Sequence, residues 1–130
     1  MPCDVMVIDD EEVVRAGIRK VLESEGLGVT DCADAATALA HPDLPRCRLV
    51  LCDLMLPDRS GTDLMRDLLQ RRPGLPVVLI TGYATLAEAD RARDAGAFDF
   101  LPKPFEASEL MHVVRRALTG ASRAAREEGT

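Results

Sequence analysis

Short apolar runs alternate along the chain with longer segments in which apolar residues recur at helical spacing. Three of the runs, VMVI, LVLC and VVLI, are nearly continuous, which is typical of strands that are buried on both faces of a sheet. Of the five runs that we interpret as strands, the second is the weakest; the five are Val5–Ile8, Leu27–Cys32, Leu49–Cys52, Val77–Ile80 and Phe98–Leu101.

Three of the intervening segments show a clear apolar face at helical spacing. These faces are Val14, Ile18, Val21 and Leu22 in the first segment, Leu64, Leu68 and Leu69 in the third, and Leu110, Val113, Val114, Ala117 and Leu118 in the fifth. The positions of glycine and proline mark where these helical segments begin and end. Gly26 and Gly28 close the first helix, Gly61 opens the third, residues 72–74 (Arg-Pro-Gly) end it, and Gly96 ends the fourth.

Strands that alternate with helices imply right-handed crossovers and a parallel sheet covered on both faces. We therefore predict a doubly wound α/β domain of five βα units, flavodoxin-like, with strand order 2-1-3-4-5. The sequence has no internal repeat, and residues 1–119 account for the whole domain. Residues 120–130 lose the apolar positions, so we expect a helix end, a linker or a tail there.

Composition limits the classes of function. The 130 residues fit one domain, and 47% apolar with 29% charged residues is ordinary for a globular protein. The net charge of −6 argues against direct binding of nucleic acid or of an anionic membrane. No apolar run approaches the ~20 residues of a membrane span, and the N-terminus MPCDVMVIDD does not resemble a secretory signal. We expect a cytoplasmic protein.

Cysteine and histidine show no arrangement that favours a metal site or a disulfide framework. None of the cysteines has CxxC spacing, and the histidines stand apart from them; these residues are Cys3, Cys32, Cys47, Cys52, His41 and His112. In a reducing compartment the expected state is a buried or half-buried free thiol at each of the four cysteines.

Polar side chains stand at the ends of four predicted strands. The first strand is followed by Asp9 and Asp10, the third by Asp53 and the fourth by Thr81, while the fifth leads to Lys103. In open α/β sheets ligands bind beyond the carboxyl ends of the strands, where the strand order reverses. The prolines on both sides of the lysine restrict its backbone. We therefore expect the lysine to be held over a carboxylate cluster.

The charges of this cluster favour a metal ion. Three carboxylates against one ammonium leave the site at about −2, and crowded carboxylates raise one another's pKa unless a cation joins them. Mg²⁺ suits a site with few carboxylates and room for waters and phosphate. A dication beside a carboxylate nucleophile, a lysine and a hydroxyl indicates phosphoryl transfer, with Asp53 as the attacking group.

Simpler interpretations exist for the same residues. Asp9 and Asp10 could cap the first helix, where we expect Glu11 and Glu12 only to favour the helix dipole. Asp53 could be a turn residue that follows its strand. The threonine and the lysine are uninformative when each is taken alone. What favours the functional interpretation is that all of them fall on one edge of the sheet.

Four stretches of the sequence resemble the receiver domain of two-component response regulators. They are VIDDEE, LCDLMLPDRSG, LITGYAT and GAFDFLPKPF, and the resemblance covers residues 4–118. The TGYAT and GAFDFLPKPF stretches are most similar to receivers of nitrogen-regulation-type transcriptional activators. The resemblance implies a receiver that accepts a phosphoryl group from a sensor histidine kinase or a phosphotransfer protein. It is then a signalling switch rather than an enzyme, and its output, transcription, belongs to another domain or partner.

The resemblance also implies a role for each matching acidic residue. Asp53 is the phosphoacceptor, and Asp10, Asp53 and the main-chain carbonyl of Met55 are the direct ligands of Mg²⁺. Asp9 acts on the ion largely through water.

The remaining matching positions belong to the switch. Lys103 pairs with the phosphoacceptor, and the peptide bond to Pro104 is expected to be cis. Thr81 donates its hydroxyl to the phosphoryl group, while Phe100 takes the place of a residue that is tyrosine in many receivers. We expect this ring to turn inward on phosphorylation and to gain roughly 1.5–3 kcal/mol of burial. Met55 and Tyr83 tune the phosphate lifetime in the family.

The fourth helix is the element that we expect to shift most easily. Its sequence, TLAEADRARDA, offers Leu86 and then mainly alanines as a buried face, so little apolar area anchors it. A stable alanine-rich helix is the alternative. If the helix shifts on phosphorylation, the face from the fourth to the fifth helix becomes available for a second copy of the domain or for an output domain.

Three rival functions remain to be weighed. A phosphatase with an aspartyl-phosphate intermediate needs a second carboxylate two residues after the nucleophile, where Met55 stands. A nucleotide- or flavin-binding domain needs a glycine-rich loop after the first strand, where this chain has four acidic residues. A degenerate receiver that binds partners without phosphorylation is the third, although all five site residues are present.

Overall fold

Five parallel strands form the sheet in the computed structural model, which describes residues 3–82 and 86–119. The strand order is β2-β1-β3-β4-β5, as the sequence predicts. The strands are β1 (Val5–Ile8), β2 (Val29–Cys32), β3 (Leu49–Asp53), β4 (Val77–Thr81) and β5 (Asp99–Pro102). The predicted limits are correct to within two residues. The main differences are that β2 starts later than expected and that β5 is displaced by one position.

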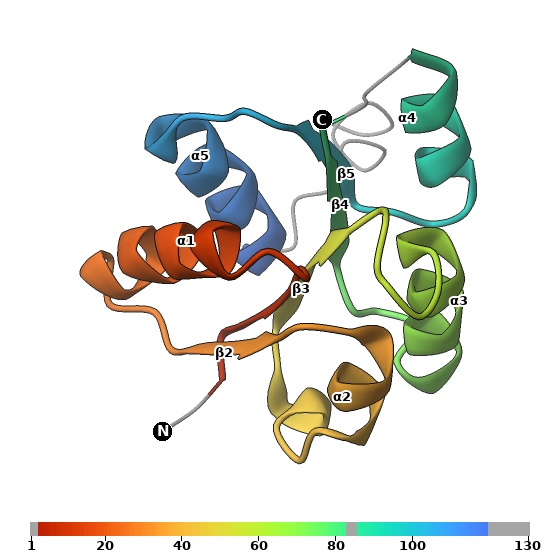
Figure 1. Ribbon diagram of the computed structural model, residues 1–130, viewed down its shortest axis with the longest axis horizontal. Coiled ribbons are helices and arrows are strands. Elements are labelled where there is room, and N and C mark those ends of the chain that lie inside the picture. Colours follow the sequence, from red (N-terminus) through yellow and green to blue (C-terminus); the bar gives the residue numbers. More distant parts are fainter. Residues whose placement is uncertain (1–2, 83–85, 120–130) are drawn as a thin grey trace.

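The helices lie in two layers, one on each face of the sheet (Figure 1). Helices α1 and α5 cover one face, and α2, α3 and α4 cover the other. Their limits are α1 (Glu12–Ser24), α2 (Ala35–Ala40), η1 (Leu44–Arg46, a short 3₁₀ turn), α3 (Gly61–Arg71), α4 (Leu86–Asp94) and α5 (Ala107–Leu118). Across the described parts of the chain, no helix combines the length and the apolar character that crossing a bilayer requires.

The three central strands are buried on both faces, which explains their continuous apolar runs. Every residue of β1, β3 and β4 is buried. Alternate side chains of β1 enter opposite layers: Val5 packs in the layer that contains Ile18 and Leu22 of α1, and Met6 packs in the layer that contains Leu64 of α3. The three helical faces predicted from the sequence are therefore the faces that contact the sheet.

The described side chains by which helix α4 packs on the sheet are small. Among its described side chains, the buried ones are Ala89 and Ala92, so the alanine part of the face expected from the sequence is confirmed. The side chain of Leu86 and the residues 83–85, which include Tyr83, lie outside the part of the chain that is described. Residues 120–130, the expected helix end, linker or tail, also lie outside it.

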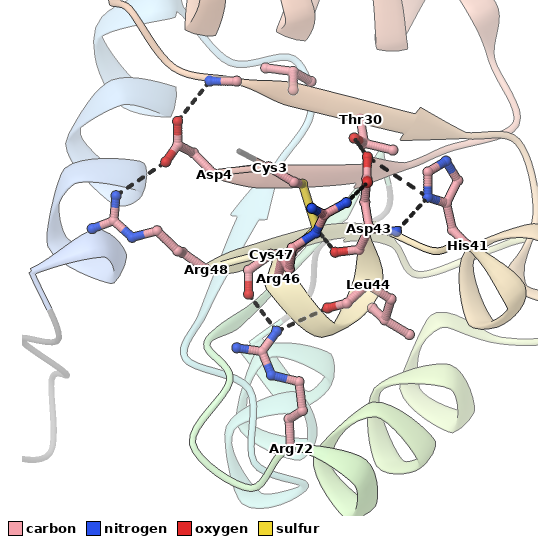
Figure 2. Close-up of a disulfide and its surroundings, with 12 residues drawn as sticks. Cys3, Asp4, Thr30, His41, Asp43, Leu44, Arg46, Cys47, Arg48 and Arg72 are labelled. Atoms are coloured by element: carbon pink, nitrogen blue, oxygen red, sulfur yellow. Dashed lines mark hydrogen bonds and ion pairs between the residues drawn. A yellow bond between two sulfur atoms is a disulfide. The ribbon is translucent and has the colours of Figure 1, made fainter. Parts of the chain in front are cut away.

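Cys3 and Cys47 form a disulfide (Figure 2), so the prediction of four free thiols is wrong for this pair. The register explains the pairing. Val5 of β1 lies opposite Leu49 of β3 in a parallel pair, and each cysteine stands two residues before one of these partners. The two Cα atoms are consequently 4.8 Å apart although 44 positions separate them in sequence. A search for CxxC spacing cannot detect a contact that strand pairing creates.

The other two cysteines are free and buried, as the sequence predicts. Burial, together with the charge of Asp31, raises the pKa of the Cys32 thiol to about 11. Burial likewise raises the pKa of the Cys52 thiol. Both side chains therefore stay protonated near neutral pH and act as small apolar residues.

The segment that carries Cys47 is held by several further contacts at the amino end of the sheet (Figure 2). The guanidinium of Arg72 donates to the carbonyl oxygens of Leu44 and Cys47. Asp43 accepts hydrogen bonds from the Thr30 hydroxyl at 2.8 Å and from Arg46 at 3.0 Å. These contacts fasten one end of the sheet, and the opposite end is left to carry the polar cluster.

Candidate functional site

The structure brings the polar strand ends together on the carboxyl edge of the sheet, as predicted. Ile8 lies opposite Cys52 in the β1–β3 pair, so Asp9 and Asp53 are the next residues of two neighbouring strands. Thr81 ends β4, and Lys103 directly follows β5. Asp9, Asp53 and Thr81 are all buried, at 0%, 6% and 2% exposure. These polar groups can be buried because a lysine and several carboxylates converge at this edge of the sheet.

Lys103 is the cation of this cluster. Its ammonium donates to Asp9 Oδ2 at 2.9 Å and to Asp53 Oδ2 at 3.2 Å, and it lies 3.4 Å from Glu11 Oε1. Its backbone N–H donates to the carbonyl of Thr81 at 2.7 Å, and its peptide bond to Pro104 is cis. The lysine is therefore fixed at both its backbone and its ammonium, with the ammonium directed between two carboxylates.

Asp53 is a carboxylate under opposing influences. Burial raises its pKa, and the charge of Asp9 adds to this, while the N–H of Met55 and the ammonium of Lys103 act in the other direction. The net result is a raised pKa. For Lys103, burial lowers the pKa, but its hydrogen bond with Asp9 and the charge of Asp53 outweigh that effect and raise it. The lysine is therefore protonated at neutral pH, and one ammonium does not fully compensate its carboxylates.

Four carboxylates of this edge are close enough to share one cation. One oxygen each from Asp9, Asp10, Glu11 and Asp53 lies within 4.8 Å of the others. Four carboxylates (−4) against the one ammonium (+1) leave a formal charge of −3. All the donors are oxygens, which suits a hard dication such as Mg²⁺. The side chains at this edge therefore fit a magnesium ion.

The carboxylates open into a pocket of about 440 Å³. It is lined by Asp10, Glu11, Asp53, Met55, Leu56, Pro57, Thr81, Gly82 and Lys103. The pocket has room for a phosphoryl group and waters next to the phosphoacceptor candidate. Asp10 is exposed, which leaves its carboxylate accessible from this opening.

Glu11 belongs to the cluster, contrary to the expectation that it only favours the helix dipole. It is the N-cap residue of α1 and makes no side-chain cap hydrogen bond. Its side chain extends to Lys103 instead. In the sequence, the one indication that Glu11 joins the cluster is its position next to Asp10. What distinguishes it from Glu12 is its contact with Lys103, 92 positions away.

The helix-cap interpretation of Asp9 accounts for only part of its contacts. Asp9 Oδ1 accepts the N–H of Glu11 at 2.8 Å, so it does hold the start of α1. Its other oxygen accepts from Lys103. Similarly, Asp53 Oδ1 accepts the N–H of Met55 at 3.1 Å, a turn contact, while Oδ2 faces the lysine. Each aspartate thus has a local structural role and a place in the cluster.

Phe100, the residue expected to act as the aromatic switch, is buried in this structure. The residue is 8% exposed and belongs to the apolar layer beneath α3 and α4. Little of the ring is exposed in this conformation, and the rotation expected on phosphorylation stays a prediction. The sequence predicts that Phe100 lies in a strand, but it does not show whether the neighbouring helices bury the ring or leave it exposed to solvent.

The loop that follows Asp53 doubles back tightly. Met55 and Ser60 form an antiparallel bridge, and the N–H of Gly61 donates to Leu54 O at 2.7 Å. A Cβ atom on Gly61 would lie 2.3 Å from the carbonyl oxygen of Asp53. Gly61 is therefore required by this close approach as well as by its place at the start of α3.

Comparisons with known proteins agree with this geometry. The family of the response regulator receiver domain matches residues 5–115. The C4-dicarboxylate transport transcriptional regulatory protein DctD of Rhizobium meliloti is 36% identical over 113 residues, 87% of this chain and 25% of that protein. The chain spans between a quarter and a half of the length of the curated relatives it matches.

Solved receiver structures are also similar. The receiver domain of NtrX from Brucella abortus is 36% identical, with a TM-score of 0.84 over 89% of this chain and 98% of that one. The beryllofluoride-activated NtrC4 receiver domain dimer is 26% identical, with a TM-score of 0.84 over 89% of this chain and 96% of that one. The likeness to NtrC- and NtrX-type receivers agrees with the sequence motifs.

Proposed function

Because this chain belongs to the response regulator receiver family, we propose that it accepts a phosphoryl group on Asp53 from a histidine kinase or a phosphotransfer protein. The observation that carries the proposal is the Asp53 carboxylate at the base of the acidic pocket. One of its oxygens is held by the N–H of Met55, and the other lies 3.2 Å from the ammonium of Lys103. A carboxylate with a raised pKa in such a site suits nucleophilic attack.

In the proposed reaction an oxygen of Asp53 forms a bond to phosphorus while the bond from phosphorus to the donor's histidine nitrogen breaks. The ammonium of Lys103 compensates charge on the transferred oxygens, and the Thr81 hydroxyl donates to one of them. Bound Mg²⁺ supplies further charge neutralisation; Asp10, Asp53 and the main-chain carbonyl of Met55 would hold it, with Asp9 acting through water. Asp9 also keeps the lysine in place through its 2.9 Å hydrogen bond.

Phosphorylation from a small acyl phosphate tests the proposal directly. Incubating the protein with Mg²⁺ and acetyl phosphate should add one phosphoryl group to its intact mass, and Asp53→Asn should abolish the gain. Asp63→Asn is the matched control, because this exposed aspartate lies on α3, outside the carboxylate cluster, and pairs with Arg66. Equal labelling of wild type and Asp53→Asn would sink the assignment, and no labelling of the wild type would favour a phosphorylation-independent interaction module.

Metal binding provides a separate test. Mg²⁺ should bind weakly without phosphate, and Asp10→Ala should remove this binding. Glu12→Ala is the control, since Glu12 carries the same charge on the first turn of α1 but is not part of the carboxylate cluster. An unchanged Mg²⁺ titration in Asp10→Ala would show that Asp10 only supports the start of the helix.

We also propose that phosphorylation changes the face formed by α4, β5 and α5 and promotes self-association through it. Two observations support this: the buried residues among the described side chains of α4 are alanines, and the beryllofluoride-activated receiver of NtrC4 is a dimer. Thr81 connects the phosphoryl group to this face, because it ends β4 beside β5. Phe100 lies on β5 next to the strand that Thr81 ends, so we propose that the response involves the β4 end, this ring and α4.

The response can be separated from the chemistry. Thr81→Ala should still accept phosphate but lose most of the change in amide spectra over residues 86–118 and most of the self-association seen by sedimentation. Identical spectral changes in phosphorylated wild type and Thr81→Ala would contradict the coupling.

A transcriptional output is the final part of the proposal. The matched relatives are transcriptional regulators that are two to four times longer than the segment they share with this chain. DNA binding by the acidic receiver itself is not expected. The output is therefore proposed to lie in another domain or in a partner that the α4–β5–α5 face controls.

A further inference from the structure

The tip of the loop after β3 is tied to a neighbouring helix by one side chain. The base of this loop is closed by the Met55–Ser60 bridge and by the Gly61–Leu54 hydrogen bond. At the tip, Asp58 Oδ1 accepts the N–H of Ala35 at 3.1 Å, and Asp58 Oδ2 accepts the N–H of Ala36 at 3.0 Å. Both donors are at the start of α2, more than twenty positions earlier in the chain.

These two hydrogen bonds are distinct from the ordinary cap of α2. The N-cap residue of that helix is Asp34, whose side chain accepts the N–H of Thr37 at 2.7 Å. Asp34 and Asp58 therefore satisfy different N–H groups of the same short helix. Only Asp58 comes from the loop that contains Met55. The hydrogen bonds from Ala35 and Ala36 also lower the pKa of Asp58, so its carboxylate is charged near neutral pH.

We propose that Asp58 is a positioning residue for the phosphoacceptor site, a role that rests on the proposed function of Asp53. Met55 lies between Asp53 and Asp58, and its N–H holds an oxygen of Asp53. Its main-chain carbonyl is the proposed third protein ligand of Mg²⁺. By fixing the loop tip to α2, Asp58 limits the conformations of the Met55 peptide before an ion binds. Less conformational entropy is then lost when the ion binds.

The other contact of the tip does not replace this one. Arg59 pairs with Asp67 of α3 at 2.7 Å, which ties the tip to the helix that the loop itself leads into. Asp58 instead joins the loop to α2, a helix that precedes the loop in the sequence. Together the two contacts attach the tip to α2 and to α3. Removing the Asp58 side chain leaves the Arg59–Asp67 ion pair with α3.

The alternative is that Asp58 merely stabilises α2, and a matched pair of substitutions separates the two roles. Asp58→Ala and Asp34→Ala each remove a side chain that accepts N–H groups at the start of the same helix, but only Asp58→Ala frees the loop. Both should lower the melting temperature. Mg²⁺ affinity, measured by titration without phosphate, should fall about tenfold in Asp58→Ala, the lower end of the loss seen for groups that orient metal ligands. In Asp34→Ala it should change less than twofold.

Phosphorylation by acetyl phosphate gives a second readout. In Asp58→Ala the Mg²⁺ concentration for half-maximal rate should rise by a similar factor, while the rate at saturating Mg²⁺ stays near that of the wild type. Asp58→Asn keeps one acceptor oxygen and should be intermediate; it also carries the test if the alanine variant does not fold.

The outcomes distinguish this inference from the function on which it rests. Wild-type protein that neither binds Mg²⁺ nor takes up phosphate would refute the proposed function. Wild-type protein that does both, together with equal Mg²⁺ affinities in the Asp58 and Asp34 variants, would refute only the positioning role. The positioning role would also be refuted if Asp58→Ala lowered the phosphorylation rate at saturating Mg²⁺ without changing the Mg²⁺ affinity.

Discussion

Single side chains set the charge balance at the carboxyl edge of the sheet. Lys103 contacts three carboxylates, and two of them are almost fully buried. A buried carboxylate is costly unless it is paired, and one ammonium shared among several provides only part of the compensation. The site therefore trades stability of the folded chain for a carboxylate that is ready to react and to bind a cation.

This trade predicts that neutralising Asp53 stabilises the protein in the absence of Mg²⁺. Asp53→Asn keeps the shape and the contact with Met55 but removes one of the crowded charges. The free energy of unfolding in urea should rise by on the order of 1 kcal/mol, the size of a typical single-substitution effect. Lys103 keeps Asp9 as its partner, so the substitution does not leave the ammonium isolated.

The difference between the two proteins should also depend on pH with a definite sign. The pKa of Asp53 is raised above its ordinary value of 3.8 in the folded protein. The folded state therefore holds a proton that the unfolded chain has already lost, and wild-type stability falls as the pH rises through this window. The advantage of Asp53→Asn should grow upward from pH about 4 and then level off. A pH-independent or reversed difference would contradict the raised pKa.

Contacts at the ends of a helix fix its position as much as the side chains that it packs against the sheet. The start of helix α3 can pass directly over the backbone of Asp53 because Gly61 has no Cβ atom. Ser60 caps the helix by accepting the N–H of Asp63. Helix α4, in contrast, contributes only alanines to the core among its described side chains. The element that forms the phosphoacceptor loop is thus held tightly, and the element proposed to move is held loosely.

A pair of glycine substitutions tests the tight approach at α3. Gly61→Ala should destabilise the protein by about 1–3 kcal/mol, as overpacking does, because its Cβ would meet the backbone of Asp53 and Leu54. Gly17→Ala is the control: it lies inside α1 with nothing within 4 Å of its Cβ. It should gain roughly 0.5–1 kcal/mol from the lower flexibility of the unfolded chain.

Urea denaturation of both variants measures these opposite effects. Gly61→Ala should also slow phosphorylation, since the backbone that must shift belongs to the phosphoacceptor. A Gly61→Ala protein that is as stable as the wild type and is phosphorylated at the same rate would show that the loop can relax without cost.

Across the whole molecule, the two ends of the sheet serve different purposes. The carboxyl edge carries the uncompensated charges and the pocket, whereas the amino edge carries the Cys3–Cys47 disulfide and the hydrogen bonds of Arg72. The disulfide joins the beginning of the domain to its central strand. Its contribution to stability is therefore separate from the chemistry of the site.

Reduction of the disulfide should destabilise the protein without changing phosphorylation. For a loop of 44 residues the chain-entropy estimate is about 4 kcal/mol. Urea denaturation with and without dithiothreitol measures the loss, and Cys3→Ser should be less stable and insensitive to the reductant. A thiol assay on the unfolded, unreduced chain should find two free cysteines, Cys32 and Cys52. Four free thiols and no effect of the reductant would refute the bond.

The sequence alone determined the order of the elements and most of the site, for a local reason. Burial on both faces gives β1, β3 and β4 their continuous apolar runs, and parallel strands place their carboxyl ends together. The sequence therefore places Asp9, Asp53, Thr81 and Lys103 at one edge of the sheet. Each of them directly follows or ends a strand that its own neighbours in sequence define.

Only the tertiary structure decided the contacts that depend on register and on neighbours distant in sequence. The pairing of Cys3 with Cys47 follows from the alignment of Val5 with Leu49, which no spacing rule along the chain contains. The contact of Glu11 with Lys103 and the hydrogen bonds of Asp58 with α2 join segments that are far apart in the sequence. Local patterns specify which residues are buried, but the side chains that meet are set by how the elements pack against one another.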